Sequence, residues 1–256
     1  MIPIYTEEEF TKLEEDERFL TEEAILVMLA FLAATKNSLE KELRNFYQLY
    51  GKDGVVTYQE ARKWVGDDDH RRRLTALFAV IKDNFDILHS KLNPKFDSFL
   101  SQVAEKETDF FGVDIDREDV LNTPWGVDKE TWYERLEEDI ALWAAYVAVD
   151  IKQSLVKRAH VEAVVEQLGK RFDSIESVLR TLGISESTAV GSLARQRIFK
   201  ELGITKYQFF TRPDERRCEH CGSMHGMIFP ITAYEVGVTA SPIHPRCRCW
   251  EVPIME

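Results

Sequence analysis

The sequence predicts a mainly α-helical protein, with long helices forming a body that is followed by a small β-rich module at the C-terminal end (an α+β chain). Long stretches without glycine or proline carry apolar residues at helical spacing. Short aromatic and β-branched runs separated by turn residues occur only after residue 205. A chain of 256 residues with 44% hydrophobic content can bury a large core, which excludes a mainly disordered protein.

The first half is predicted to be built from helices. Residues 21–50 contain no glycine or proline and start with a Thr-Glu-Glu sequence typical of a helix N-cap, so one long helix is expected to end at the turn Gly51–Gly54. The pattern Thr57–Glu60 is that of a capping box and predicts a short helix. Another helix is expected to start at the Asp67–Asp69 triplet and to end or kink at Pro94.

An irregular segment separates two predicted domains. Residues 110–126 mix aromatic residues, Asp, Gly and Pro without any period, which is typical of a connection. The predicted domains are therefore an N-terminal helical domain over residues 1–126 and a second domain over residues 127–256. The four cysteines all lie in the second domain, so no disulfide framework can hold the whole chain together.

The second domain is predicted to begin with helices and to end with strands. Apolar residues recur every three or four positions from Trp132 to Leu155, which marks an amphipathic helix. A helical pattern continues to about Leu202, with interruptions expected at Gly169 and Gly183. Three short segments are predicted as strands: Lys206–Thr211, Met227–Phe229 and Cys249–Val252.

Charge is distributed unevenly along the chain. Residues 1–151 hold 18 basic and 33 acidic residues, whereas residues 152–256 hold 15 and 12. The overall net charge of −12 disfavours a general nucleic-acid coat or a binder of anionic membranes, and the second part is the side better suited to DNA. The longest apolar run, Ala24–Ala34, is too short to cross a bilayer, which takes about 20 residues. The acidic N-terminal sequence lacks the features of a secretory signal, so a location on the cytosolic side is expected.

The C-terminal module carries the spacing of a metal site. Cys218-x-x-Cys221 and His244-x-x-Cys247 each place two soft ligands on one tight turn, and together they offer the four ligands of a tetrahedral Zn²⁺ site. Cys249 is the alternative to Cys247 as the fourth ligand. Because this short segment has little core of its own, a structural Zn²⁺ would contribute directly to its folding.

Other interpretations of the same residues stay open. His220 and His225 are reserve ligands, and the cysteines can instead be reduced or paired as two disulfides. Nearby arginines can neutralise the charge of a thiolate-rich site. The basic run Arg71–Arg73 is expected to pair with the aspartates that precede it rather than to bind nucleic acid.

The sequence favours a binding protein over an enzyme. It contains no Gly-rich phosphate loop, no Gly-x-Ser-x-Gly elbow and no His-Glu-x-x-His helix. A catalytic zinc ion would need an open coordination position and a nearby acid or base, for which Asp214, Glu219 or His225 are the candidates. Five candidate ligands for four positions instead indicate a closed, structural site, and we expect no catalytic residues.

The C-terminal motifs resemble a known family. Asp214-x3-Cys218-x2-Cys221 and the later Pro242-x-His244-Pro-x-Cys247-x-Cys249, with Gly226 and Phe229 between them, resemble the signature of the Mu-F-like minor head proteins of tailed bacteriophages, the phage head morphogenesis family. Upstream, Arg180-Thr181 and Gly203-Ile-x-x-Tyr207 are similar to the segment that precedes the Cys-x-x-Cys in that family. The run Glu42–Tyr50 followed by Val55–Ala61 resembles the helix and turn near the start of many minor head proteins.

This resemblance implies a virion component inside the capsid at the portal vertex, assembled in the host cytoplasm. Residues 127–256 would be the head-morphogenesis domain, with its zinc module at about residues 207–256. The implied role is head assembly and DNA packaging or ejection by binding, with the portal protein as partner, the major capsid or scaffolding protein as further candidates, DNA contact through the C-terminal half and no membrane. The alternatives are a zinc-dependent hydrolase or nuclease and a host zinc-binding interaction module.

Overall fold

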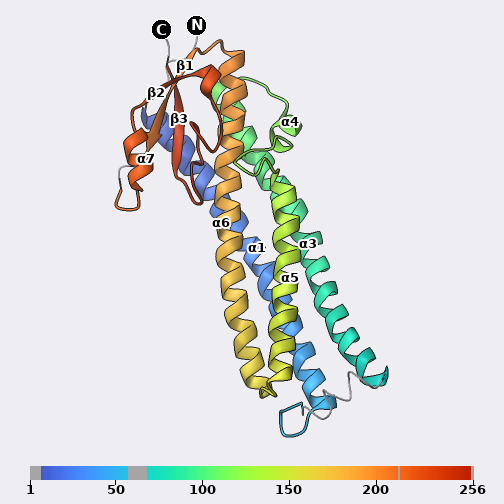
Figure 1. Cartoon of the computed structure of the whole chain (residues 1–256). Helices are drawn as coiled ribbons and strands as arrows, with labels where there is room; N and C mark the ends of the chain where they lie inside the picture. Colours follow the sequence, from blue (N-terminus) through green and yellow to red (C-terminus); the bar gives the residue numbers. More distant parts are fainter. Residues whose placement is uncertain (1–6, 57–67, 213, 255–256) are drawn as a thin grey trace. The chain divides into compact units, whose positions relative to one another are not determined.

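Long helices dominate the computed structural model, which describes residues 7–56, 68–212 and 214–254 (Figure 1). A small antiparallel sheet follows them, so the predicted fold class is confirmed. In chain order the elements are α1 (Glu7–Tyr50), α3 (Asp68–Phe111), α4 (Arg117–Leu121), α5 (Trp132–Val156), α6 (Val161–Glu201), β1 (Lys206–Thr211), α7 (Glu219–Met224), β2 (Ile228–Pro230), the 3-10 turn η1 (Ile231–Ala233) and β3 (Cys249–Ile254).

The described residues form two compact units, each assembled from several segments of the chain. One, here called the sheet unit, draws on Met1–Leu26, Lys95–Arg135 and Arg180–Glu256. The other, here called the bundle unit, draws on Val27–Pro94 and Leu136–Leu179. The division into residues 1–126 and 127–256 stays a prediction about the organisation of the sequence.

The bundle unit is formed by segments of α1, α3, α5 and α6 that bury one apolar face each. The Phe85 and Phe172 rings lie 6.2 Å apart in its core, and Arg44 of α1 forms two hydrogen bonds with Glu162 of α6. The turn after α1 is confirmed: Gly54 has a φ of 75°, and a Cβ there would lie 2.2 Å from Nε2 of His160. Only glycine fits that position, because it combines the left-handed conformation with the close approach of a ring.

The sheet unit places its strands next to the last part of α6. β1 is the central strand in the order β2-β1-β3, and its register pairs Tyr207 with Phe229 and Thr211 with Cys249. Alternate residues of β1 are buried, as expected for a strand with one face in the core. The predicted strands are confirmed to within one or two residues at each end.

α6 changes character along its length. Before Arg180 it is amphipathic, with one buried face. Between Thr181 and Phe199 buried positions fall on every side of the helix, and small residues occupy many of them. A helix enclosed on all sides is typical of the centre of a domain, so this segment forms the core of the sheet unit.

One expected helix boundary is wrong. α1 begins at Glu7 rather than near Thr21, because the sequence holds no glycine or proline between Glu7 and Tyr50 and helical hydrogen bonding can continue. Inside that helix, the Thr21 hydroxyl donates to the Glu17 carbonyl rather than capping an N-terminus. Two further expectations lie wholly or partly outside the residues that the structure describes. They are the pairing of Arg71–Arg73 with Asp67–Asp69 and the capping box at Thr57–Glu60.

Residues expected to interrupt helices lie inside them instead. α3 continues through Pro94 to Phe111, and the fully buried Leu92 and Phe96 lie on either side of that proline. α6 runs through Gly169 and Gly183 without a break. Tertiary burial therefore outweighs the local cost of proline and glycine at these positions, which is about 1 kcal/mol for glycine and about 3 kcal/mol for proline.

The irregular connection is largely confirmed, although it contains a five-residue helix. α4 is capped by Asp116, whose carboxylate accepts a hydrogen bond from the Asp119 amide, and Val120 and Leu121 anchor it in the core. A carboxylate at this position satisfies one of the free amides at the start of a helix. α4 therefore has both a cap and apolar anchors although it spans little more than one turn.

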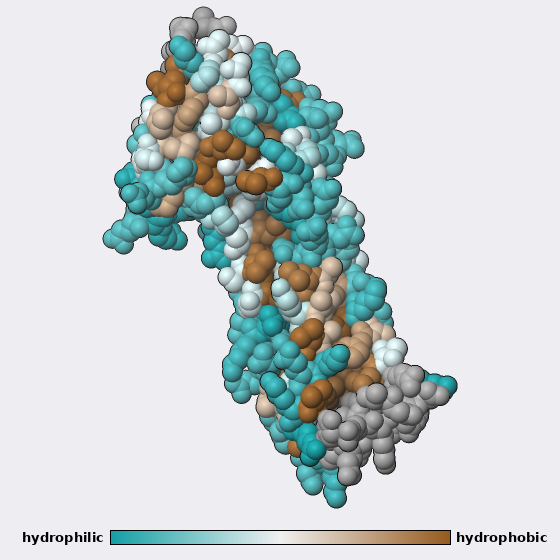
Figure 2. Space-filling view, viewed as in Figure 1, coloured by the Kyte–Doolittle hydropathy of each residue, from teal (hydrophilic) through white to brown (hydrophobic). Residues whose placement is uncertain are grey.

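Hydrophilic side chains cover most of the face seen in Figure 2, with apolar patches between them. One set of exposed apolar residues, here called the α5 apolar face, lies on neighbouring positions of α5: Ala141, Leu142, Ala145, Tyr146 and Val149. None of the helices in the described part of the chain combines the length and the apolar character needed to cross a membrane.

Candidate metal centre

The first pair of predicted ligands lies at the start of α7. Cys218 is the N-cap residue with an extended backbone, and its sulfur accepts a hydrogen bond from the Cys221 amide at 3.2 Å. Cys221 follows in the first turn and is buried. A Cys-x-x-Cys sequence at a helix start therefore directs both sulfurs to the same side, and the free amides of the first turn stabilise a thiolate there.

The second pair lies on a turn immediately before β3. The Cys247 amide donates to the His244 carbonyl at 3.1 Å, and Arg246 between them has a φ of 59°, in the left-handed region. Cys249 is the first residue of β3, where it pairs with Thr211 of β1. The central strand thus joins the two loops that carry the predicted ligands.

All five predicted ligands converge. The Cys218 sulfur lies 3.3 Å from Nε2 of His244, and the Cys221 and Cys247 sulfurs lie 3.9 Å apart. Two overlapping groups, one with Cys218, Cys221 and His244 and one with Cys221, Cys247 and Cys249, each keep their ligand atoms within 4.8 Å of one another. In a tetrahedral site with metal–sulfur bonds of about 2.3 Å, two sulfurs lie about 3.8 Å apart. The five residues, here called the cysteine cluster, can therefore hold a metal ion.

The sulfurs of the second loop differ in their electrostatics. A hydrogen bond from Cys249 lowers the pKa of Cys247 to about 6, although burial opposes this. The same hydrogen bond, together with burial, raises the pKa of Cys249 strongly. Cys247 is thus the thiolate and Cys249 the thiol donor of this pair. Both sulfurs are buried near Cys221, and the choice of fourth ligand stays a prediction.

The first loop shows the same division of roles. The Cys221 amide lowers the pKa of Cys218, and the nearby His244 imidazole lowers it further. Burial, with the neighbouring Cys247 sulfur, raises the pKa of Cys221 to about 12. Burial lowers the pKa of His244, but the Pro245 carbonyl and the sulfurs of Cys247 and Cys218 outweigh it, so the net shift is upward. A soft divalent ion binds such a group of thiols and imidazole by displacing their protons.

The reserve ligands do not join the cluster among the described residues. His220 is exposed. His225 is the C-cap residue of α7, where its Nδ1 accepts from the Thr211 amide and its ring meets Phe210 edge to face.

Asp214 binds Arg248 through two hydrogen bonds of 2.5 and 2.6 Å, which raises the pKa of that arginine. The Cys249 and Cys247 sulfurs contribute to the rise.

A second group of charged residues in the sheet unit was not anticipated from the sequence. Arg195 of α6 is only 2% exposed, and its guanidinium forms ion pairs with four carboxylates. This group, here called the carboxylate cluster, consists of Arg195 together with Glu14, Glu17, Glu107 and Glu251. It joins α1, α3, α6 and β3 through one cation.

The carboxylate cluster holds fewer positive than negative charges, so protons complete its balance. Burial raises the pKa of Glu14 to about 7 against the opposing effect of Arg195. Burial and the neighbouring Glu107 raise the pKa of Glu17 well above its usual value. Glu251 is held by the Ser192 hydroxyl at 2.8 Å and the Ser241 amide at 2.6 Å.

One sequence signal could have located this cluster. The residues just before Arg195 include Gly191, Ser192 and Ala194, which are small and allow other elements to pack closely around this part of α6. A buried arginine requires carboxylate partners. The sequence does not say which ones, because Glu14, Glu107 and Glu251 are far from it in the chain.

The C-terminal part of the chain matches a known family. Residues 145–252 match the model of a family described as phage Mu protein F like protein. The matched region contains the end of α5, all of α6 and nearly all of the sheet, with both loops that carry the predicted ligands. A search of curated proteins and a search of solved structures each returned no match.

Proposed function

We propose, from the membership of residues 145–252 in the phage Mu protein F-like family, that this phage head protein is a minor head protein that acts at the portal vertex. Its role would be head assembly and DNA packaging or ejection, by binding rather than by catalysis. Its location would be the interior of the virion. The observation that carries the proposal is the family match over the region that contains the cysteine cluster.

We further propose that the cysteine cluster holds one structural Zn²⁺ ion. Thiolate and imidazole ligands at these separations suit zinc, and the closed set leaves no position for a substrate water. The ion would fix the loop that precedes α7 to the turn that precedes β3. Zinc would supply cross-linking rather than chemistry, which agrees with a protein that works by binding.

The α5 apolar face supports contact with another protein. Leu142, Tyr146 and Val149 are each more than two-fifths exposed, whereas Trp143 and Val147 of the same helix are buried. A contiguous exposed apolar surface is typical of an interaction site. The portal protein is the proposed partner, with the major capsid or scaffolding protein as the alternative.

Co-purification with the portal protein of the same phage or prophage tests this role. The wild-type chain is expected to co-purify with portal oligomers, and the double variant Leu142→Asp/Val149→Asp is expected to lose that binding. The variant Val127→Asp, at a 96% exposed position outside α5, is the matched control and should bind normally. A wild-type chain that binds neither portal nor capsid protein, and is missing from purified particles, would overturn the proposal.

Metal content tests the ligand set. Elemental analysis of the purified protein is expected to give about one zinc ion per chain. Cys218→Ser and Cys247→Ser should each lower the zinc content or affinity, whereas Cys249→Ser should retain the ion. Retention in Cys247→Ser with loss in Cys249→Ser would make Cys249 the fourth ligand, and no zinc in the wild-type chain would refute the site.

A further inference from the structure

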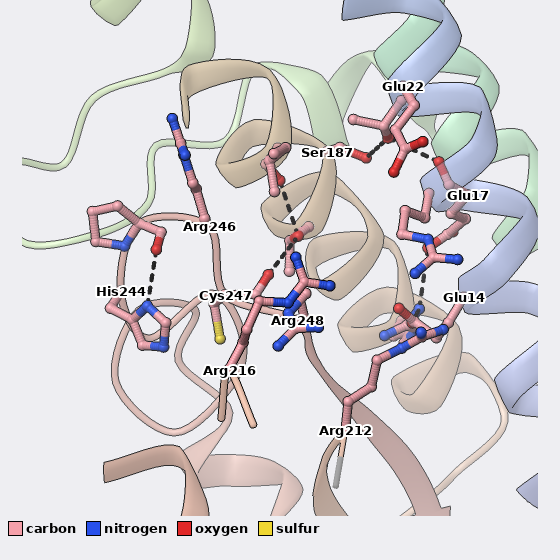
Figure 3. Close-up of a pocket in the computed structure, with 16 residues that line it drawn as sticks. Glu14, Glu17, Glu22, Ser187, Arg212, Arg216, His244, Arg246, Cys247 and Arg248 are labelled. Atoms are coloured by element: carbon pink, nitrogen blue, oxygen red, sulfur yellow. Dashed lines mark hydrogen bonds and ion pairs between the residues drawn. The ribbon is translucent and has the colours of Figure 1, made fainter. Parts of the chain in front are cut away.

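A cavity of about 460 Å³ lies within the sheet unit beside the cysteine cluster (Figure 3). Its walls come from the first turns of α1, from the buried part of α6 and from the loops that carry the metal-binding residues. His244 and Cys247 of the cysteine cluster are part of its lining. Its volume is in the range of small-ligand sites in proteins.

Arginine dominates the lining of this cavity. Arg195 is balanced by Glu14 and Glu17, which also line it. The five other arginines of the lining share it with one further carboxylate, that of Glu22. These five are Arg18, Arg212, Arg216, Arg246 and Arg248. Arg212 and Arg248 are paired with Glu15 and Asp214 outside the lining, so Arg18, Arg216 and Arg246 give the cavity most of its positive charge.

Two of the arginines are available to a ligand. Within the described residues, the Arg18 and Arg216 guanidinium groups form no ion pair, and both residues are exposed at the cavity. Arg246 donates through Nε to the neutral Thr181 hydroxyl at 2.8 Å. Figure 3 shows the Arg248 side chain close to Cys247, whereas the Arg246 side chain extends away from His244 and Cys247. Guanidinium groups from separate segments that converge on one space suit an anion with several oxygens.

Hydroxyl groups also line the cavity, where the Thr21 and Thr188 protons are donated to the Glu17 and Ile184 carbonyls of their own helices. Thr21 of α1 and Ser187 of α6 both line the cavity, and their hydroxyl oxygens lie 2.6 Å apart. Thr188 lies beside them and also lines the space. The donors that remain are guanidinium groups, and several of them together match the three or four oxygens of a phosphate group. We propose that this cavity binds phosphate groups.

The cysteine cluster sets the geometry of this site. Arg216 lies two residues before Cys218, and Arg246 and Arg248 lie on either side of Cys247. Arg246 keeps a left-handed backbone, which a non-glycine residue adopts only where its surroundings hold it. A metal ion that fixes both loops would therefore also fix the arginines that these loops carry. Loss of the metal is expected to weaken phosphate binding although the number of arginine charges at the cavity stays the same.

The phosphate can come from two sources: the phosphodiester backbone of DNA, or a free phosphate compound. The choice of DNA rests on the proposed function in the phage head, whereas the phosphate site itself rests on the cavity. Fluorescence anisotropy with a labelled 20-base-pair duplex, and calorimetry with inorganic pyrophosphate, distinguish the two sources. Binding of the duplex with competition by pyrophosphate assigns DNA, and binding of pyrophosphate alone assigns a free phosphate compound.

A matched pair of arginines tests the location. Arg216 lines the cavity, whereas the adjacent Arg217 is also exposed but lies against Gly222 of α7 and is not part of the lining. Arg216→Gln is expected to weaken binding of whichever probe binds by about tenfold, the equivalent of one charge-assisted hydrogen bond. If the probe is DNA, its salt dependence should also fall by about one counterion. Arg217→Gln should change the affinity by less than about twofold.

Two results would overturn the proposal. One is failure of the wild-type protein to bind either the duplex or pyrophosphate at low salt. The other is an equal effect of the Arg216 and Arg217 variants, which would indicate general charge attraction rather than a site. Arg18→Gln repeats the test from α1, at an exposed position whose loss leaves the core intact. Portal co-purification of Arg216→Gln should stay normal, so failure of this inference is distinguishable from failure of the proposed function.

Discussion

The sheet unit contains two clusters of ionisable side chains that balance their charge by different means. The cysteine cluster consists of sulfurs and an imidazole from two loops. None of its ligand atoms carries a permanent positive charge. The carboxylate cluster gathers four glutamates from three elements around the guanidinium of Arg195. One cluster can therefore bind an ion from solution, and the other can take up protons.

The difference decides what each cluster holds together. The ligands of the cysteine cluster lie on short segments, so an ion there fixes local structure around α7 and the start of β3. The carboxylate cluster joins residues that are far apart in the chain, such as Glu14, Glu107 and Glu251. Its integrity is therefore linked to the assembly of the whole sheet unit. The two clusters should respond differently to chelators, to substitution and to pH.

The largest expected effect is that of metal removal on the two loops. Free energies of structural zinc binding are on the order of 10 kcal/mol, and in this site they would add to the packing of Cys221, Cys247 and Cys249 against Phe209 and Met224. Chelation, or Cys221→Ser, should expose the bonds after Arg216 and Arg217 to trypsin while α6 stays resistant. Limited proteolysis followed by mass spectrometry measures this. Unchanged cleavage in the presence of a strong chelator would mean that the loops do not depend on an ion.

The next largest effect is expected for Arg195→Met. This change leaves buried carboxylates without their cation, and breaking a buried pair in this way costs about 3–5 kcal/mol. Arg197→Met is the matched control, because Arg197 lies two residues away and forms a partly exposed pair with Asp119 at 2.6 Å that is worth about 0–1 kcal/mol. Urea unfolding midpoints compare the two variants. A loss in Arg195→Met no larger than in Arg197→Met would contradict the central role of the guanidinium.

The two clusters also differ in how far the sequence predicts them. The sequence predicts four ligands because they form two pairs whose members lie three residues apart, and each pair lies on one local turn of the structure. These are Cys218, Cys221, His244 and Cys247. The partners of Arg195 lie more than 50 residues away from it, and no local pattern encodes them. Ligands that lie close together in the sequence can be predicted from their spacing, whereas ion pairs between distant elements depend on tertiary packing.

The same reasoning explains which features of the fold were predicted. The amphipathic period of α5 and the aromatic runs of β1 and β3 are local, and these elements are confirmed. Pro94 and Gly183 are also local signals, but burial on both sides of them outweighs their preference to end a helix. The cavity lined by Arg18 and Arg216 combines residues from both ends of the chain, so only the folded structure brings them together.

A smaller effect is expected from pH, and its direction separates the clusters. Burial raises the pKa of Glu14 from an unfolded value of 4.5 to about 7. A carboxyl whose pKa is higher in the folded than in the unfolded chain stabilises the folded state fully at a pH below its unfolded pKa. This stabilisation is lost as the pH rises through about 7. Between pH 6 and pH 8 the free energy of unfolding should fall by about 1 kcal/mol.

Urea titrations at pH 6 and pH 8 measure this loss, and Glu14→Gln is the control that should remove most of it because the amide cannot ionise. The cysteine cluster should respond in the opposite direction, because acid protonates its ligands and releases the ion. Equal pH dependence in the wild-type chain and Glu14→Gln would assign the effect to another group.

The smallest effect is expected for a neutral contact that lies next to the carboxylate cluster. The Thr21 and Ser187 hydroxyls lie 2.6 Å apart and join α1 to α6, as the arginine does, but without charge. Thr21→Val keeps the shape of the side chain and removes the hydroxyl, so the loss should be about 1 kcal/mol. Urea unfolding at pH 6 measures it, with Ser187→Ala as the reciprocal change. A loss as large as that of Arg195→Met would show that contact between α1 and α6, rather than charge balance, sets the stability of the sheet unit.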